Sequence, residues 1–141
     1  MSSDQRARML ERDKAMRKAR DKILRRVGEW LKAKGFTQAG VGHYTRLAID
    51  QVCHIGFQKL SSGRTVRVMC HITSDAGEPH SIRGPWSDHF SGKRAPNGKG
   101  YFFGWNTRET DIARCADEYC RYIDEVVVVW FKKQVGKKWQ A

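Results

Sequence analysis

Apolar residues near the N-terminus recur at steps of three and four positions, the spacing of one face of an α-helix. Between Ser3 and Lys34 the chain contains no proline and one glycine, and it is rich in residue types that favour helices. Gly35 follows as a residue typical of a helix end. We therefore predict one long helix over residues 3–34, whose second half packs on a core. Its core positions are Met16, Ala19, Ile23, Val27, Trp30 and Leu31.

Three runs with apolar and polar residues in alternation follow, at residues 43–49, 51–60 and 65–73, and each predicts a β-strand with one apolar face. A two-residue turn at Ser62-Gly63, in which glycine supplies a positive φ, sets the register of the last two runs. In this register Ile55 lies opposite Cys70 and His54 opposite His71, and both apolar faces point to the same side. The three runs predict an antiparallel meander.

The chain from residue 74 to 131 predicts a long loop, a fourth strand and a second helix. Residues 74–99 contain all three prolines and form the loop. Tyr101 to Trp105 resembles a strand, and Asn106 with Glu109 three residues later fits a helix N-cap with a capping box. The helix then runs to about Phe131, with a short strand at the β-branched residues 126–129 as an alternative. Its core positions are Ile112, Ala116, Tyr119, Ile123, Val127 and Trp130.

Together these elements predict an α+β fold with a long N-terminal helix, a four-stranded antiparallel β-meander and a C-terminal helix packed on one sheet face. We expect a single α+β domain over residues 16–131. Residues 1–15 are expected to form a basic helical extension, and residues 132–141 a basic, solvated C-terminal tail. With 141 residues, of which 40% are hydrophobic, the chain is long enough to bury a core of its own.

The formal net charge is +12, and it is unevenly distributed. Residues 1–26 hold ten basic and four acidic side chains, and residues 132–141 hold four lysines and no acid. Because lysine and arginine clusters neutralise phosphates, one interpretation is a nucleic-acid-binding module that uses these two ends. Acidic residues interrupt the first cluster, which is more typical of a solvated helix face. We therefore rank nucleic acid below a protein as the expected partner.

Candidate chemistry is confined to the histidines. His54 faces His71 in the predicted register, and His43 on the preceding strand would add a third ligand to a metal site. The alternative is a row of histidines on a half-exposed sheet face, which we favour because no second group of ligands completes a site. We expect no metal and no cofactor.

Motifs of nucleophile elbows, phosphate loops, zinc proteases and dinucleotide folds are absent from the sequence. We therefore predict that the protein is not an enzyme and has no catalytic residues. Four cysteines lie in apolar patterns without CxxC spacing, which indicates reduced thiols.

The longest apolar run, Val126 to Phe131, is far shorter than the roughly 20 residues of a membrane-spanning helix. The N-terminus is charged from Asp4 onward and has no apolar signal-peptide core. We therefore expect a cytoplasmic protein that does not enter a membrane.

Several short motifs occur in order between residues 22 and 131. They are Lys34-Gly35-Phe36, His43-Tyr44-Thr45-Arg46, Gln51-Val52 through Phe57, Ser61-Ser62-Gly63, Val66, Trp105 and Arg114-Cys115. Their order and spacing resemble the bacterial family called domain of unknown function 4304. That family has no assigned catalytic residues, and some members resemble, by gene context, immunity proteins that neutralise a toxin of the same bacterium. The resemblance implies a cytosolic protein-binding domain whose partner is a cognate toxin.

The charge departs from what this resemblance implies. Immunity proteins that face nuclease toxins are usually acidic, because such toxins are basic and complementary charge steers the encounter. A chain with a charge of +12 instead suits an acidic or neutral toxin. Aromatic and arginine side chains dominate protein interfaces. The candidate partner-binding residues are therefore Arg83, Trp86 and Phe90 of the long loop, and Arg17 and Arg25 of the first helix.

Overall fold

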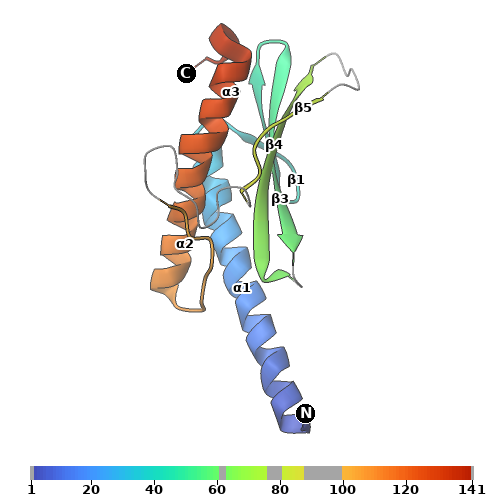
Figure 1. The fold of residues 1–141 in the computed structure, drawn as a ribbon, viewed down its shortest axis with the longest axis vertical. Coiled ribbons are helices and arrows are strands. Elements are labelled where there is room, and N and C mark those ends of the chain that lie inside the picture. Colours follow the sequence, from blue (N-terminus) through green and yellow to red (C-terminus); the bar gives the residue numbers. More distant parts are fainter. Residues whose placement is uncertain (1, 61–62, 76–80, 88–99, 141) are drawn as a thin grey trace.

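Five antiparallel strands form one sheet in the order of the sequence, β1-β2-β3-β4-β5 (Figure 1). The computed structural model describes residues 2–60, 63–75, 81–87 and 100–140. The α+β class is confirmed, but short edge strands on both sides of the predicted meander raise the number of strands from four to five. The strands are β1 (Thr37–Gly40), β2 (His43–Ala48), β3 (Gln51–Leu60), β4 (Thr65–Ser74) and β5 (Ser81–Arg83).

The two long central strands, β3 and β4, pair in the predicted register. Ile55 lies opposite Cys70, and His54 lies opposite His71. Gly63 has a φ of +82°, the conformation that the turn requires, whereas Ser62 lies outside the described residues. Because side chains alternate along each strand, this register puts one set of apolar side chains on the buried face. That set includes Cys53, Ile55, Val66, Val68, Cys70 and Ile72.

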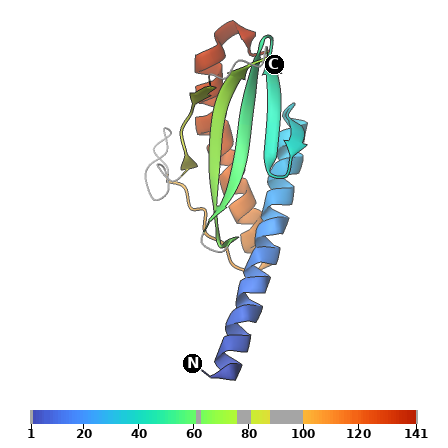
Figure 2. The same cartoon turned by 90° about the vertical axis from the view of Figure 1, so that its right-hand side faces the viewer.

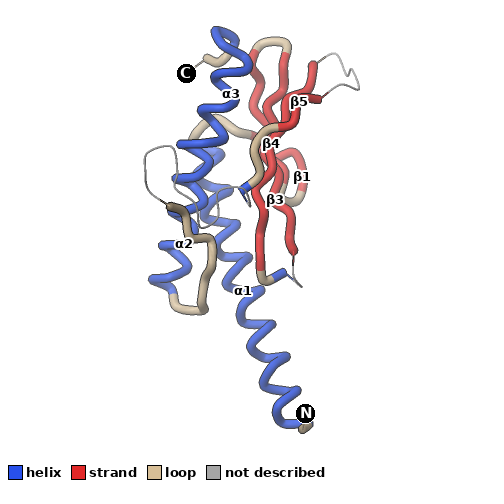
Figure 3. Tube along the Cα trace, viewed as in Figure 1, coloured by secondary structure: helices blue, strands red, loops and turns tan. Residues whose placement is uncertain are grey.

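Helices cover one face of the sheet, and no helix of the described residues covers the other (Figures 1 and 3). One is α1 (Ser3–Ala33); the other is a continuous rod of α2 (Glu109–Tyr122), the π-helical turn η3 (Ile123–Val127) and α3 (Val128–Val135). The strand alternative at residues 126–129 is therefore wrong. Both predicted stripes face the core, except that Met16, Trp30 and Trp130 are only partly buried. The buried members are Ala19, Ile23, Val27, Leu31, Ile112, Ala116, Tyr119, Ile123 and Val127.

The first part of α1 extends beyond the sheet and away from the second helix (Figure 1). Residues 2–12 are all exposed, and the helix begins with a capping box between Ser2 and Gln5. Contact with the sheet starts at Asp13, whose Oδ1 lies 3.4 Å from Nη1 of Arg64 at the turn between β3 and β4. The second half of α1 therefore packs on the domain, and the first part does not.

The predicted fourth strand at Tyr101 to Trp105 is wrong, although its alternation is real. Tyr101, Phe103 and Trp105 are buried, but none of them belongs to a strand of the sheet. Tyr101 and Phe103 pack against α2, with the Phe103 and Tyr119 ring centroids 4.7 Å apart, and Trp105 Nε1 donates to the Met16 carbonyl of α1 at 3.0 Å. A strand pattern shows that one side of a segment is buried and does not show which element covers it.

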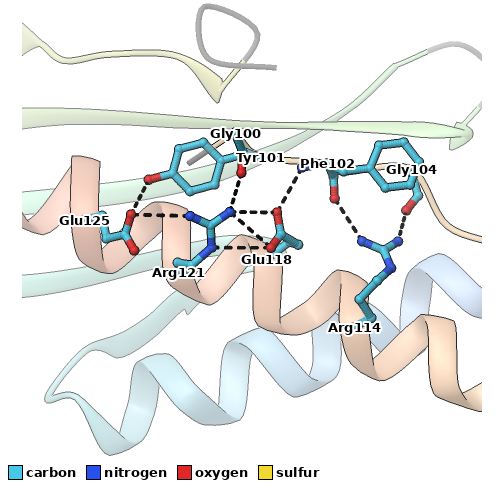
Figure 4. A network of polar contacts seen from close by, with 8 residues as sticks. All are labelled: Gly100, Tyr101, Phe102, Gly104, Arg114, Glu118, Arg121 and Glu125. Atoms are coloured by element: carbon cyan, nitrogen blue, oxygen red, sulfur yellow. Dashed lines mark hydrogen bonds and ion pairs between the residues drawn. The ribbon is translucent and has the colours of Figure 1, made fainter. Parts of the chain in front are cut away.

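Side chains of α2 satisfy the backbone of this segment in place of a neighbouring strand (Figure 4). Arg114 donates to two carbonyl oxygens, that of Phe102 at 3.1 Å and that of Gly104. Glu118 accepts a hydrogen bond from the Phe102 amide at 2.9 Å. Arg121 donates to the Gly100 carbonyl and to Glu118. These arginines and Glu118 clamp the segment along the helix.

The predicted capping box at the start of α2 is also wrong. The N-cap residue is Arg108, which makes no side-chain capping bond. The amide of Asn106 donates to Asp111 at 2.7 Å, and the Asn106 side chain accepts from the Arg108 amide at 2.9 Å, so Asn106 stabilises the turn before the helix. Glu109 instead pairs with Lys22 at 2.6 Å and links α2 to α1.

The C-terminal helix continues beyond the predicted end at Phe131. It ends at Val135, which is buried, and the turn η4 (Gly136–Lys138) follows. Where the sequence suggested a solvated tail, Lys138 pairs with Asp50 at 2.9 Å, and the Trp139 ring lies 6.1 Å from that of Phe131. Residues beyond 131 thus pack on the domain through Val135 and Trp139, which lie between the lysines in the sequence.

Candidate functional site

We call the face of the sheet that no described helix covers the open face (Figure 2). The strand pairing places most of the residues with candidate chemistry on it. Residues directly opposite each other on paired strands point to the same side, so the register fixes which side chains belong to it. None of the strand positions on this face carries a carboxylate, and two carry arginine; Asp50 and Asp75, the next pair in the register, lie just beyond the strands. The open face consists of Thr37, His43, Thr45, Leu47, Val52, His54, Gly56, Gln58, Leu60, Thr65, Arg67, Met69, His71, Thr73, Ser81 and Arg83.

The three predicted histidines meet in a stack across β2, β3 and β4. His43 Nε2 lies 2.9 Å from His54 Nδ1, and the ring centroids of His54 and His71 lie 4.1 Å apart with 7° between their planes. His54 Nε2 is also 2.8 Å from Thr73 Oγ1. Both ring nitrogens of His54 are therefore engaged within the sheet.

The environment of the stack favours neutral imidazoles. Burial, followed by the neighbouring His71 and His43, lowers the pKa of His54 from 6.5 to about 4. Burial also lowers the pKa of His71, with His43 and Arg83 adding to the effect. A proton on either ring would put a positive charge beside other nitrogen bases and beside Arg83.

The stack does not have the geometry of a metal site. A metal ion needs ligand atoms that converge on one point, whereas these rings lie parallel and face one another. Within the described residues, no group of three or more His, Cys, Asp or Glu side chains is placed to hold a metal ion. The favoured interpretation of histidines on a half-exposed sheet face agrees with this geometry.

Two of the predicted partner-binding residues lie on or beside the open face. Arg83 of β5 is exposed and lies directly opposite His71. Trp86 follows β5, and the guanidinium of Arg67 lies 4.9 Å from the centre of its ring. The adjacent Ser87 is buried and accepts a hydrogen bond from the Val68 amide at 2.9 Å, which holds this segment beside β4.

The other three predicted residues are not part of the open face as described. Phe90 lies outside the described residues. Arg17 and Arg25 belong to α1, which lies on the opposite side of the sheet. Arg17 lies beside Gly63 at the turn between β3 and β4, and Arg25 lines a groove between α1 and the strands.

Arg67 is the residue of this face that sequence reasoning missed. It donates to Gln58 at 3.2 Å and stacks on Trp86, so it joins the two central strands to the segment after β5. A signal was available, because Arg67 alternates with Met69 and His71 on the polar side of its strand. Its contact with Trp86 depends on the path of the chain after β5, which no local pattern encodes.

No family model, curated protein or solved structure matches this chain. The family resemblance therefore stays a prediction. In the described part of the chain, no helix combines the length and the apolar character needed to cross a bilayer.

Proposed function

We propose that the chain is a non-catalytic protein-binding domain that receives an acidic partner surface on the open face of its sheet. The observation that supports this most strongly is the composition of the face. Arg67 and Arg83 lie on it, Trp86 packs against Arg67, and no strand position of the face carries a carboxylate. Arginine and tryptophan are the side chains most enriched among residues that dominate binding energy.

The proposed class of partner is a bacterial toxin that this protein neutralises as an immunity protein. The resemblance to the domain of unknown function 4304 family motivates this proposal, and the charge of the open face refines it. Complementary charge accelerates encounter and disfavours wrong partners, so the toxin would present an acidic patch. Leu47, which is 64% exposed on the same face, would add apolar contact at its rim.

Co-expression tests the proposed function. The product of the neighbouring reading frame should arrest growth when expressed alone, and the present protein should restore growth and co-purify with that product. The Arg67→Glu/Arg83→Glu variant should fail to restore growth, whereas Arg12→Glu on the exposed part of α1 should restore it. A neighbouring product that is harmless alone and does not co-purify would contradict the immunity function.

Nucleic-acid binding is a second candidate, which the exposed part of α1 favours. Arg6, Arg12 and Lys14 are exposed there, and none of them forms an ion pair within the described ranges. Fluorescence anisotropy with mixed oligonucleotides at two salt concentrations tests this candidate. Binding to duplex DNA should weaken as salt rises, with log affinity falling by about 0.9 per neutralised phosphate for each tenfold increase. No binding at low salt would exclude it.

A further inference from the structure

A groove separate from the open face lies between α1 and the turn that joins β1 to β2. It has a volume of about 290 Å³, close to the lower limit for small-molecule sites. Its apolar lining includes Leu24 of α1, Tyr44 of β2 and Phe57 of β3, with the last two rings packed edge to face. We call this feature the α1 groove.

Gly28, in the middle of α1, allows the groove to form. A Cβ atom at this position would lie 2.2 Å from the hydroxyl oxygen of Tyr44, so only glycine permits the tyrosine to approach the helix. Glycine inside a helix costs about 1 kcal/mol relative to alanine. The close approach of Tyr44 gives this residue a physical reason to be glycine.

The hydroxyl of Tyr44 is available to a ligand. Tyr44 is only 7% exposed and lines the groove, yet its hydroxyl makes no hydrogen bond within the described part of the chain. The body of Tyr44 is buried, whereas its hydroxyl oxygen stays accessible to solvent in the groove. A ligand oxygen can therefore replace water as its hydrogen-bond partner.

The charges around the groove favour an anion. Its two acids are paired, Asp21 with Arg20 at 2.8 Å and Glu29 with Lys32 at 3.4 Å. Arg25 and Lys59 also line the groove, and neither forms an ion pair with any described residue. Two cations are thus left beside an apolar surface and an unpaired hydroxyl.

We propose that the α1 groove binds a small carboxylate with an apolar body the size of a phenyl ring or a short alkyl chain. The apolar body packs on Leu24, Tyr44 and Phe57. The carboxylate pairs with Arg25 and Lys59. This site is independent of the open face, because α1 lies on the other side of the sheet.

Titration followed by two-dimensional amide NMR tests the proposal, with 3-phenylpropanoate as the probe and 3-phenylpropylamine as its cationic counterpart. The carboxylate should produce saturable shifts at the amides of Gly28, Gly42 and Phe57, with a dissociation constant on the order of 1 mM. The amine should leave these amides unchanged. Equal shifts with both probes, or no saturable shift with the carboxylate, would overturn the proposal.

Two charge-reversal variants complete the test. The double variant Arg25→Glu/Lys59→Glu should weaken binding of 3-phenylpropanoate by at least about tenfold, because each substitution removes a charge-assisted contact with the carboxylate. Lys18→Glu is the matched control, an exposed lysine of α1 that does not line the groove, and should bind as the wild type does. Unchanged affinity in the double variant, with its amide spectrum still that of a folded protein, would also overturn the proposal.

Discussion

His43 Nε2 lies 2.9 Å from His54 Nδ1, and this contact begins a chain of polar groups that ends at Thr73 on the fourth strand. In neutral histidine one ring nitrogen donates and the other accepts, so the chain can run in either direction. A protonated His54 would donate from both ring nitrogens, and His43 Nε2 and Thr73 Oγ1 can each accept. What opposes its protonation is burial, followed by the neighbouring His71 and His43, which lower the pKa of His54.

Stability should fall as the pH drops from about 6.5 to 4. The pKa of His54 is about 4 in the folded protein and near 6.5 in the unfolded chain, so between these values the unfolded chain binds more protons. The free energy lost is of order 1 kcal/mol after allowance for solvent screening of this half-exposed group. Urea denaturation at pH 7.5 and 4.5 measures it.

The His54→Gln variant isolates this effect from the titration of carboxylates, which takes place in both proteins. The difference in free energy of unfolding between wild type and variant should shrink by about 1 kcal/mol on going to pH 4.5. A difference that stays constant with pH would show that His54 does not titrate as the structure implies.

Gly28→Ala should destabilise the protein by about 1 to 2 kcal/mol, although alanine is the better helix former. The new Cβ would meet the Tyr44 hydroxyl oxygen at 2.2 Å. Tyr44→Phe removes that oxygen, so Gly28→Ala should cost much less in a Tyr44→Phe background. Thermal unfolding of the two single variants and the double variant measures the coupling. A stabilising Gly28→Ala in the wild-type background would contradict the close approach.

Ile49→Asn should stabilise the protein by about 1 kcal/mol. Ile49 lies in the turn between β2 and β3 with a φ of +58°, a conformation that penalises a β-branched side chain and suits asparagine. Its side chain is 60% exposed, so little packing is lost. Ile49→Ala keeps most of the backbone penalty and serves as the control. Equal stabilities of the asparagine and alanine variants in urea would contradict the explanation.

Arg121→Ala should destabilise the fold by about 1 to 3 kcal/mol, because it leaves the Gly100 carbonyl and Glu118 without this partner. Its guanidinium also lies 4.2 Å from the centre of the Tyr101 ring. Arg108, at the start of α2, makes no such side-chain contacts with the described residues, so Arg108→Ala should be near neutral. Urea denaturation measures the free energy of unfolding of both variants. Equal losses would show that the contacts of Arg121 with Gly100 and Glu118 contribute nothing to stability.

Local patterns were enough to predict the central strands and the core faces of both helices. The register of β3 and β4 follows from the Gly63 turn and the alternation, which agree with each other. The edge strands β1 and β5 were missed because they are short and fully exposed, so they carry no alternation. The segment from Tyr101 was misassigned because the covering element is a helix, and only tertiary structure reveals it.

Part of the candidate site was also predictable from the strand register. The register alone brings the histidines together, and Arg83 joins them through its pairing with His71. The contact of Arg67 with Trp86 was not predictable, because it joins β4 to a segment beyond the long loop. Packing of Trp139 on Phe36 likewise depends on where the C-terminal helix ends.

The central claim is that the open face binds the proposed partner, and calorimetric titration with the purified product of the neighbouring reading frame tests it most directly. The Arg67→Glu/Arg83→Glu variant should bind about 100-fold more weakly than wild type, because it reverses two charges on the open face. The Arg12→Glu/Lys18→Glu variant, with the same change in net charge, should bind within about threefold of wild type. Wild-type affinity in the open-face variant, or an equal loss in both variants, would contradict the claim.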